Sequence, residues 1–228
     1  MQPYLFPYIG YFQLIASCDR FVIHDDVQYI KGGWINRNRI LVNGNPTYIT
    51  LPIRSDASHL GINERHFTPD FEKQKTSLAR QIEGAYRKAP FYNGAYEMIR
   101  ECLQVQDENV ASFVTQTIKQ FCQYIGITTP FVTSSSLTKD STLQAEDRVI
   151  AINKVLGADI YINPIGGLEL YKRENFASNG IDLRFIRTHD LQYPQFSAPF
   201  VPALSIIDVM MFNPKEKVLE FLTMSDLI

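Results

Sequence analysis

The alternation of apolar and polar residues predicts β-structure near the amino terminus. Arg20–His24 is a compact apolar run that ends in charge, a pattern typical of a buried strand. Apolar and polar residues alternate along Trp34–Val42, and Thr47–Ile53 is rich in strand formers. The Asn43–Pro46 cluster between these two segments consists of turn residues. We therefore expect a β-hairpin over residues 34–53.

Helical periodicity dominates the middle of the chain. Helix formers fill Pro69–Lys88, Pro90–Val105 reads as a second helix, and Glu108–Tyr124 carries apolar residues at helical spacing. These segments predict a helical block over residues 69–125. A shorter amphipathic helix is expected over Tyr11–Cys18, ahead of the first strand.

Beyond Pro130 the chain alternates between strand and helix patterns. The expected strands are Phe131–Thr133, Asp159–Ile162 and Ile181–Ile186, and the expected helices are Ala145–Leu156, Ser205–Phe212 and Pro214–Leu222. Strands separated by helices pair in parallel through right-handed crossovers. We expect one α/β domain over residues 1–228, with a Rossmann-like, mainly parallel sheet, a β-hairpin insert and the helical middle block.

The composition excludes some classes of protein but does not indicate a function. The 228 residues are 45% hydrophobic and 20% charged, with a formal net charge of −2, which gives no support for general nucleic-acid binding. The three cysteines are widely spaced and form no Cys-x-x-Cys pair, so neither a disulfide framework nor a zinc knuckle is indicated. No apolar stretch of membrane-spanning length and no export signal occur. These features predict a cytoplasmic protein without a membrane span.

Several standard catalytic signatures are absent from the sequence. It contains no Gly-x-Gly-x-x-Gly, no P-loop, no His-Glu-x-x-His and no Gly-x-Ser-x-Gly. Tyr8-Ile9-Gly10-Tyr11 stands where nucleotidyl transferases carry a His-x-Gly-His turn, but a tyrosine stays neutral at pH 7. An ATP-using ligase or nucleotidyl transferase with this modified turn is therefore an alternative function.

The acidic end of the first predicted strand holds the candidate catalytic residues, His24, Asp25 and Asp26. A histidine beside carboxylates can act as a base, because a neighbouring anion stabilises its charged form. The alternative is a strand end followed by acidic turn residues. We expect no metal site, since adjacent side chains on a strand point to opposite faces.

The hairpin supplies candidate anion-binding residues. On a strand, Arg37 and Arg39 share one face, and two guanidinium groups there could grip a phosphate or carboxylate. Salt bridges across the hairpin are the alternative role. Trp34 could stack on a sugar ring or on a base, or it could anchor the core. The full set of predicted substrate-binding residues is Gln2, Pro3, Tyr8, Gly10, Tyr11, Tyr29, Trp34, Asn36, Arg37, Asn38, Arg39, Ser135 and Asn163.

Two further positions carry specific expectations. Gly10 permits close backbone approach, and its amide could face an anion at a helix start. Asp208 lies in an apolar run and needs a partner, which an arginine of the hairpin could supply. Asp147 and Arg148 are expected to form a structural ion pair.

The joint order of motifs resembles the WbqC-like family along essentially the whole chain. The matching segments are Gln2-Pro3, Pro7–Phe12, Asp25–Tyr29, Trp34–Ile40, Ser134–Ser136, Asp147-Arg148, Tyr161–Pro164, Gly166-Gly167 and Leu204–Asp208. Relatives usually carry a first apolar strand before the Gln-Pro pair. Since Met1 alone precedes it here, the resemblance implies a chain that is truncated or begins at an internal methionine, so that this first strand is missing.

The resemblance also implies a pathway. Relatives occur among genes for O-antigen, lipopolysaccharide and other bacterial surface polysaccharides, which implies a transferase that modifies a sugar or nucleotide-sugar, including transfer of an amino acid such as glycine. A small-molecule substrate is the expected partner, and a homo-oligomer stays open. No cofactor is indicated. A non-catalytic accessory or sugar-binding protein is the third alternative.

Overall fold

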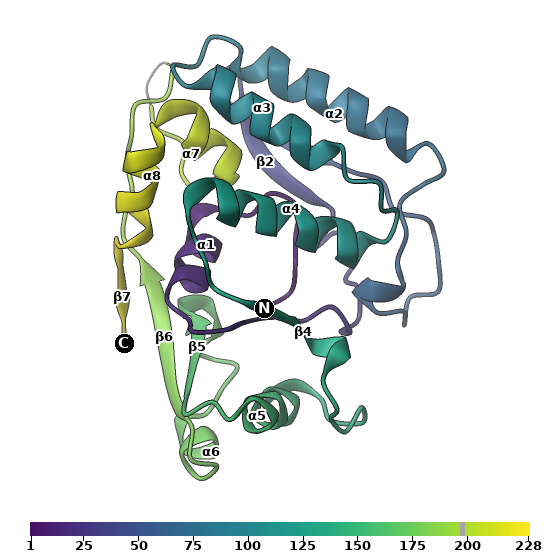
Figure 1. The fold of residues 1–228 in the computed structure, drawn as a ribbon, viewed down its shortest axis with the longest axis vertical. Coiled ribbons are helices and arrows are strands. Elements are labelled where there is room, and N and C mark those ends of the chain that lie inside the picture. Colours follow the sequence, from purple (N-terminus) through teal and green to yellow (C-terminus); the bar gives the residue numbers. More distant parts are fainter. Residues whose placement is uncertain (197–198) are drawn as a thin grey trace.

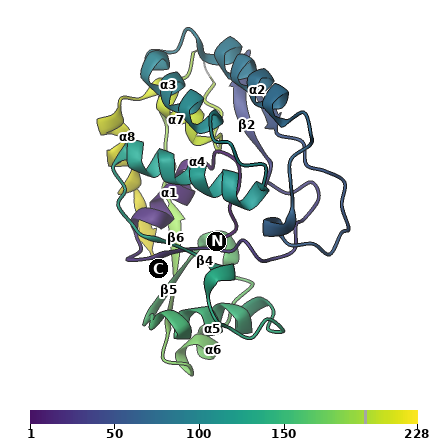
Figure 2. The same ribbon diagram turned by 45° about the vertical axis from the view of Figure 1, so that its right-hand side comes forward.

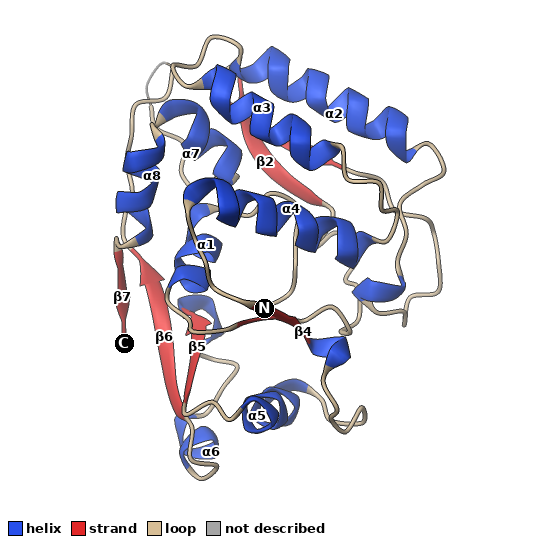
Figure 3. Cartoon of the chain, viewed as in Figure 1, coloured by secondary structure: helices blue, strands red, loops and turns tan. Residues whose placement is uncertain are grey.

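Several small sheets and a layer of helices make up the mixed α/β fold (Figures 1 and 3). The computed structural model describes residues 1–196 and 199–228. In this part of the chain, β1 (Phe21–Ile23) pairs in parallel with β4 (Phe131–Thr133), β2 (Arg37–Val42) pairs antiparallel with β3 (Asn45–Thr50), and β6 (Asp182–Thr188) lies between parallel β5 (Ile160–Pro164) and antiparallel β7 (Ser225–Leu227).

The expected single Rossmann-like sheet is not confirmed. The parallel pairs β1–β4 and β5–β6 belong to separate sheets, and β1 and β4 have three residues each. Met1 lies against the edge of β1, where its amino group donates to Val22 O at 2.7 Å and the His24 amide donates to Met1 O at 2.9 Å. The predicted hairpin is confirmed as β2–β3, with Arg37 opposite Thr50.

The helical block follows the predicted periodicity closely. Its helices are α2 (Phe71–Tyr86), α3 (Tyr92–Leu103) and α4 (Val110–Ile125). Asn109 caps α4 by accepting a hydrogen bond from the Ser112 amide at 3.0 Å, and Gly126 ends the helix at φ 102°. The block packs with α1 (Ile9–Ala16), α7 (Ile206–Phe212) and α8 (Lys215–Leu222) around the main hydrophobic core.

A second, smaller core lies at the other end of the molecule. It packs α5 (Ala145–Leu156) and α6 (Arg173–Ala177) against β6 through residues such as Val149, Phe176 and Phe185. Figure 2 shows α5 and α6 far from α2 and α3. The bounds of α5 match the prediction, whereas α6 and β7 were not predicted. No helix in residues 1–196 or 199–228 is long and apolar enough to cross a membrane.

Asp208 on α7 has different partners from those expected. It is fully buried, and it accepts hydrogen bonds of 2.7 Å each from the Tyr86 hydroxyl, the Tyr193 hydroxyl and Gln195 Nε2. The prediction that an arginine of the hairpin pairs with Asp208 was wrong, because three neutral donors satisfy the carboxylate. Burial raises the pKa of Asp208. Tyr86 also accepts from the Leu41 amide at 2.8 Å, so the carboxylate is linked to β2.

Candidate functional site

Five segments distant in sequence meet at a pocket of about 670 Å³. They are the amino-terminal segment, the end of β1, β2 with the loop before it, β5 with the loop that follows it, and Ala203 ahead of α7. The predicted residues that line this pocket are Gln2, Tyr8, His24, Trp34, Asn38, Arg39 and Asn163. Most of its wall is apolar and aromatic, with Tyr4, Tyr161 and Tyr171 added to the predicted residues. Such a wall with a few polar groups is typical of a small-molecule site.

Close packing at Gly10 sets the position of Tyr8. Tyr8 is the N-cap residue of α1, and its ring lies over Gly10 so closely that a Cβ there would collide with the ring. Any larger residue would displace Tyr8 from the pocket wall. Tyr11, one residue further on, is 2% exposed, and its hydroxyl donates to Gln2 O at 3.2 Å. Of the two tyrosines in this turn, therefore, Tyr8 lines the pocket and Tyr11 supports it.

Asn38 holds a strained bend in the amino-terminal segment. Phe6 has a φ of 44°, which is unusual for a residue with a side chain. The Asn38 amide donates to Leu5 O at 3.0 Å and to Phe6 O at 2.7 Å, and Ser205 Oγ also donates to Phe6 O at 2.7 Å. These contacts compensate for the strain and fix the segment that carries Tyr8.

Arg39 presents a largely uncommitted cation to the pocket. Its guanidinium lies 5.5 Å from the centre of the Trp34 ring, and Nη2 donates to Ala203 O at 3.4 Å. Its Nε is buried and has no hydrogen-bond partner within the described residues. No carboxylate in that part of the chain lies within ion-pair distance of Arg39. A phosphate or carboxylate of a ligand would pair with the Nη end of the guanidinium, where the contact to Ala203 is exposed.

Arg37 lies on the same strand but is used differently. Its Nε donates to Gly33 O at 2.9 Å, Nη2 donates to Gly32 O, and the guanidinium lies 4.7 Å from the centre of the Tyr48 ring. Arg37 does not line the pocket. The two arginines therefore do not converge on one anion, because the turn before β2 takes the donors of Arg37.

Asn36 and Tyr29 form hydrogen bonds within the protein and do not line the pocket. Asn36 is buried, donates to Leu51 O at 2.8 Å and accepts a hydrogen bond of 3.1 Å from the Tyr29 hydroxyl. Pro3 is buried too and lies outside the pocket lining.

Asn163 on β5 lines the pocket and packs against Gly167, where a Cβ would collide with the Asn163 amide. Gly167 thus allows Asn163 its place in the wall.

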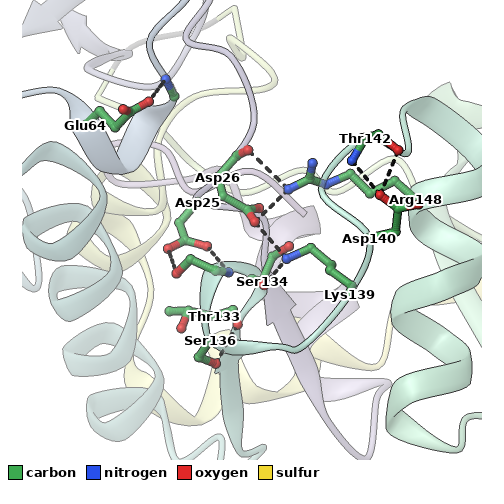
Figure 4. A network of polar contacts seen from close by, with 12 residues as sticks. Asp25, Asp26, Glu64, Thr133, Ser134, Ser136, Lys139, Asp140, Thr142 and Arg148 are labelled. Carbon is green, nitrogen blue, oxygen red and sulfur yellow. Dashed lines mark hydrogen bonds and ion pairs between the residues drawn. The ribbon is translucent and has the colours of Figure 1, made fainter.

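An ionic cluster lies at the carboxyl ends of β1 and β4 (Figure 4). Asp26 Oδ2 lies 2.8 Å from Lys139 Nζ and 2.6 Å from Arg148 Nη2. Asp25 accepts from the Ser135 amide at 2.9 Å and from its hydroxyl at 2.5 Å. These contacts join β1, the short 3-10 turn Ser134–Ser136 and α5.

The cluster keeps Asp26 ionised. Burial alone would raise its pKa, but hydrogen bonds from Lys139 and Arg148 outweigh burial and lower the pKa to about 2. A carboxylate held so firmly is a poor proton acceptor at neutral pH. The ion pairs with Lys139 and Arg148 hold the Asp26 carboxylate in place, and its role as a catalytic base stays a prediction.

His24 lies between the cluster and the pocket. The charge of the Met1 amino group and burial lower the pKa of His24, and the charges of Arg148 and Lys139 act in the same direction. Because burial also lowers the pKa of the Met1 amino group to about 5, burial and the two side-chain cations are the causes that act on His24 at pH 7. The imidazole is therefore neutral at pH 7, and can accept or donate a hydrogen bond in the pocket.

Comparison with known proteins decides the family. The model of the WbqC-like protein family matches residues 2–220. The chain belongs to the WbqC-like protein family. A similar protein of Mycobacterium tuberculosis, described as "uncharacterized protein Rv1507c", is 27% identical over 212 residues, which cover 91% of this chain and 89% of the relative. No solved structure matches.

Two members of the ionic cluster of this WbqC-like protein were missed by sequence reasoning. Lys139 lies in a polar loop without periodicity, so only its spacing from Ser134–Ser136 could have drawn attention to it. Arg148 was expected to form an ion pair with its neighbour Asp147, whereas it pairs with Asp26. Within the described residues, no group of three or more His, Cys, Asp or Glu side chains is placed to hold a metal ion.

Proposed function

We propose that this protein is a transferase of surface-polysaccharide biosynthesis, of the O-antigen type, that modifies a sugar carrying an anionic group. One observation supports this most. The pocket combines aromatic rings, an uncommitted Arg39 and a neutral His24 in one wall. Aromatic rings stack on sugar faces, and a free guanidinium suits a phosphate.

Each group has a place in this scheme. Tyr8 and Trp34 pack against the sugar ring, and Arg39 pairs with the anionic substituent. Gln2 and Asn163 donate to or accept from sugar hydroxyls. The neutral imidazole of His24 accepts a hydrogen bond from the attacking hydroxyl or amine. This hydrogen bond orients the lone pair of the attacking group toward the group to be transferred. In an aminoacyl transfer, the transferred group is glycyl or a similar acyl group.

A ligand screen tests the pocket. We expect a sugar phosphate or nucleotide-sugar to raise the melting temperature with increasing dose, by several degrees at about 100 times Kd. Arg39→Gln should weaken binding about ten- to hundredfold, because it removes a charge-assisted hydrogen bond. Arg80→Gln, an exposed arginine on α2, is the matched control and should change nothing.

The same screen separates the other functions. A shift with ATP but with no sugar compound would favour the nucleotidyl transferase with a modified turn. No shift with any sugar compound, nucleotide or acyl donor would contradict an enzyme site here and favour an accessory protein.

His24 should stay neutral well below the ordinary range of histidine. Its pKa in the folded protein is lowered to about 2 from 6.5, so the unfolded chain binds more protons below pH 6.5. The stability contributed by neutral His24 is therefore full above pH 6.5 and is lost as the pH falls toward 2. We expect its ring proton signals, assigned by His24→Gln, to stay constant from pH 8 to pH 5 in NMR spectra. A normal titration in this range would contradict an imidazole that stays neutral in the pocket.

A further inference from the structure

The mouth of the pocket is bordered by exposed apolar side chains. Ile30 is 62% exposed, Leu170 is 70% exposed and Trp34 is 44% exposed, and all three line the pocket. They come from two separate segments, the loop before β2 and the loop after β5. A single exposed apolar residue needs no explanation, but a cluster around the mouth of a pocket indicates an apolar ligand surface.

Arg39 gives this mouth a positive charge. Its guanidinium packs on Trp34, one of the three apolar residues, and the buried Nε has no partner within the described residues. The polar groups of His24, Asn163 and Gln2 line the same pocket and are less exposed than Ile30 and Leu170. From its interior to its mouth, the pocket therefore presents polar groups, then the positive charge of Arg39, and then apolar side chains.

We propose that the sugar substrate is joined through a phosphate to a hydrocarbon chain, as in a lipid-linked sugar phosphate. This inference rests on the proposed function and names its substrate class. The sugar lies beside His24 and Asn163, the phosphate pairs with Arg39, and the hydrocarbon covers Ile30 and Leu170. A nucleoside in the same place would leave its polar base edge against apolar side chains.

Soluble probes test this order of surfaces. The probes are N-acetylglucosamine 1-phosphate, its decyl phosphodiester, decyl phosphate and UDP-N-acetylglucosamine, each below any micelle-forming concentration, with Kd measured by calorimetry. We expect the decyl phosphodiester to bind at least tenfold more tightly than the sugar phosphate, since each buried methylene contributes about fourfold. In the double variant Ile30→Ser, Leu170→Ser this gain should disappear, while the sugar phosphate binds as before.

Leu168→Ser is the matched control, because Leu168 is 44% exposed in the same loop but does not line the pocket. The gain should persist in this variant. A decyl phosphodiester no tighter than the sugar phosphate, or a gain that survives the double substitution, would overturn the inference and leave the sugar site standing. Tighter binding of UDP-N-acetylglucosamine would overturn it in favour of a nucleoside.

Two outcomes concern the proposed function itself. If decyl phosphate binds as tightly as the phosphodiester and the sugar phosphate does not bind, the apolar mouth is real but the sugar site is not. If none of the four probes binds, both proposals are wrong.

Discussion

Asp26→Asn is expected to lower the free energy of unfolding by about 3–5 kcal/mol. The substitution removes the anion that pairs with Lys139 and Arg148, whose side chains are only 5% and 14% exposed. A buried cation left without its partner costs far more than the pair contributes. Thermal and urea unfolding should both report the loss, and a melting temperature lowered by roughly ten degrees would accompany it.

The chain provides a matched control for Asp26. Asp182 pairs with Arg184 at 2.7 Å, but their side chains are 52% and 43% exposed. Since exposed pairs contribute about 0–1 kcal/mol, Asp182→Asn should be nearly neutral. Equal and small effects of the two substitutions would show that the Asp26 cluster does not hold β1, β4 and α5 together.

Lowering the pH should also reveal how much the Asp26 cluster contributes to stability. The pKa of Asp26 falls from 3.8 to about 2 in the folded protein, so the folded state binds fewer protons than the unfolded chain between these values. The stability from ionised Asp26 is complete above about pH 4 and is lost as the pH falls through 2. The Asn variant lacks this part of the acid dependence.

Local patterns were sufficient for the longer helices, but not for the short elements α6 and β7. The apolar stripes of α4 and α5, and the glycines after them, fix their bounds, because a helix buries one face and ends where a left-handed residue follows. The hairpin β2–β3 followed from alternation and a turn cluster. The arrangement of the sheets did not follow, since pairing depends on contacts between strands far apart in sequence.

The candidate site was predicted only in part, because the sequence shows residue types but not which side chains lie close together. The residue types of Tyr8, Trp34, Arg39 and Asn163 suggested ligand binding, and they line one pocket. Sequence could not separate Arg39 from Arg37, because both occupy the same face of β2 and only the turn at Gly32-Gly33 distinguishes them. Lys139 was not predicted, because its loop has no periodicity and only its spacing from Ser134–Ser136 sets it apart.

Tyr86→Phe is expected to cost about 2–4 kcal/mol of unfolding free energy. The Tyr86 hydroxyl donates to Asp208 and accepts from the Leu41 amide, so its removal leaves two buried groups with one partner fewer. Tyr92→Phe is the control, because Tyr92 is only partly buried and its hydroxyl makes no hydrogen bond within the described residues.

The effect should also depend on pH in a direction opposite to that of Asp26. Burial raises the pKa of Asp208 above 3.8, so the folded protein binds more protons than the unfolded chain between 3.8 and the raised value. Ionised Asp208 therefore costs stability as the pH rises through this range, and its three donors limit that cost. Removing the Tyr86 donor should make the variant lose more stability between mildly acidic and neutral pH than the wild type, in urea unfolding at several pH values. A constant difference between the two proteins at every pH would mean that the hydroxyl stabilises Leu41 alone and that the carboxylate does not need it.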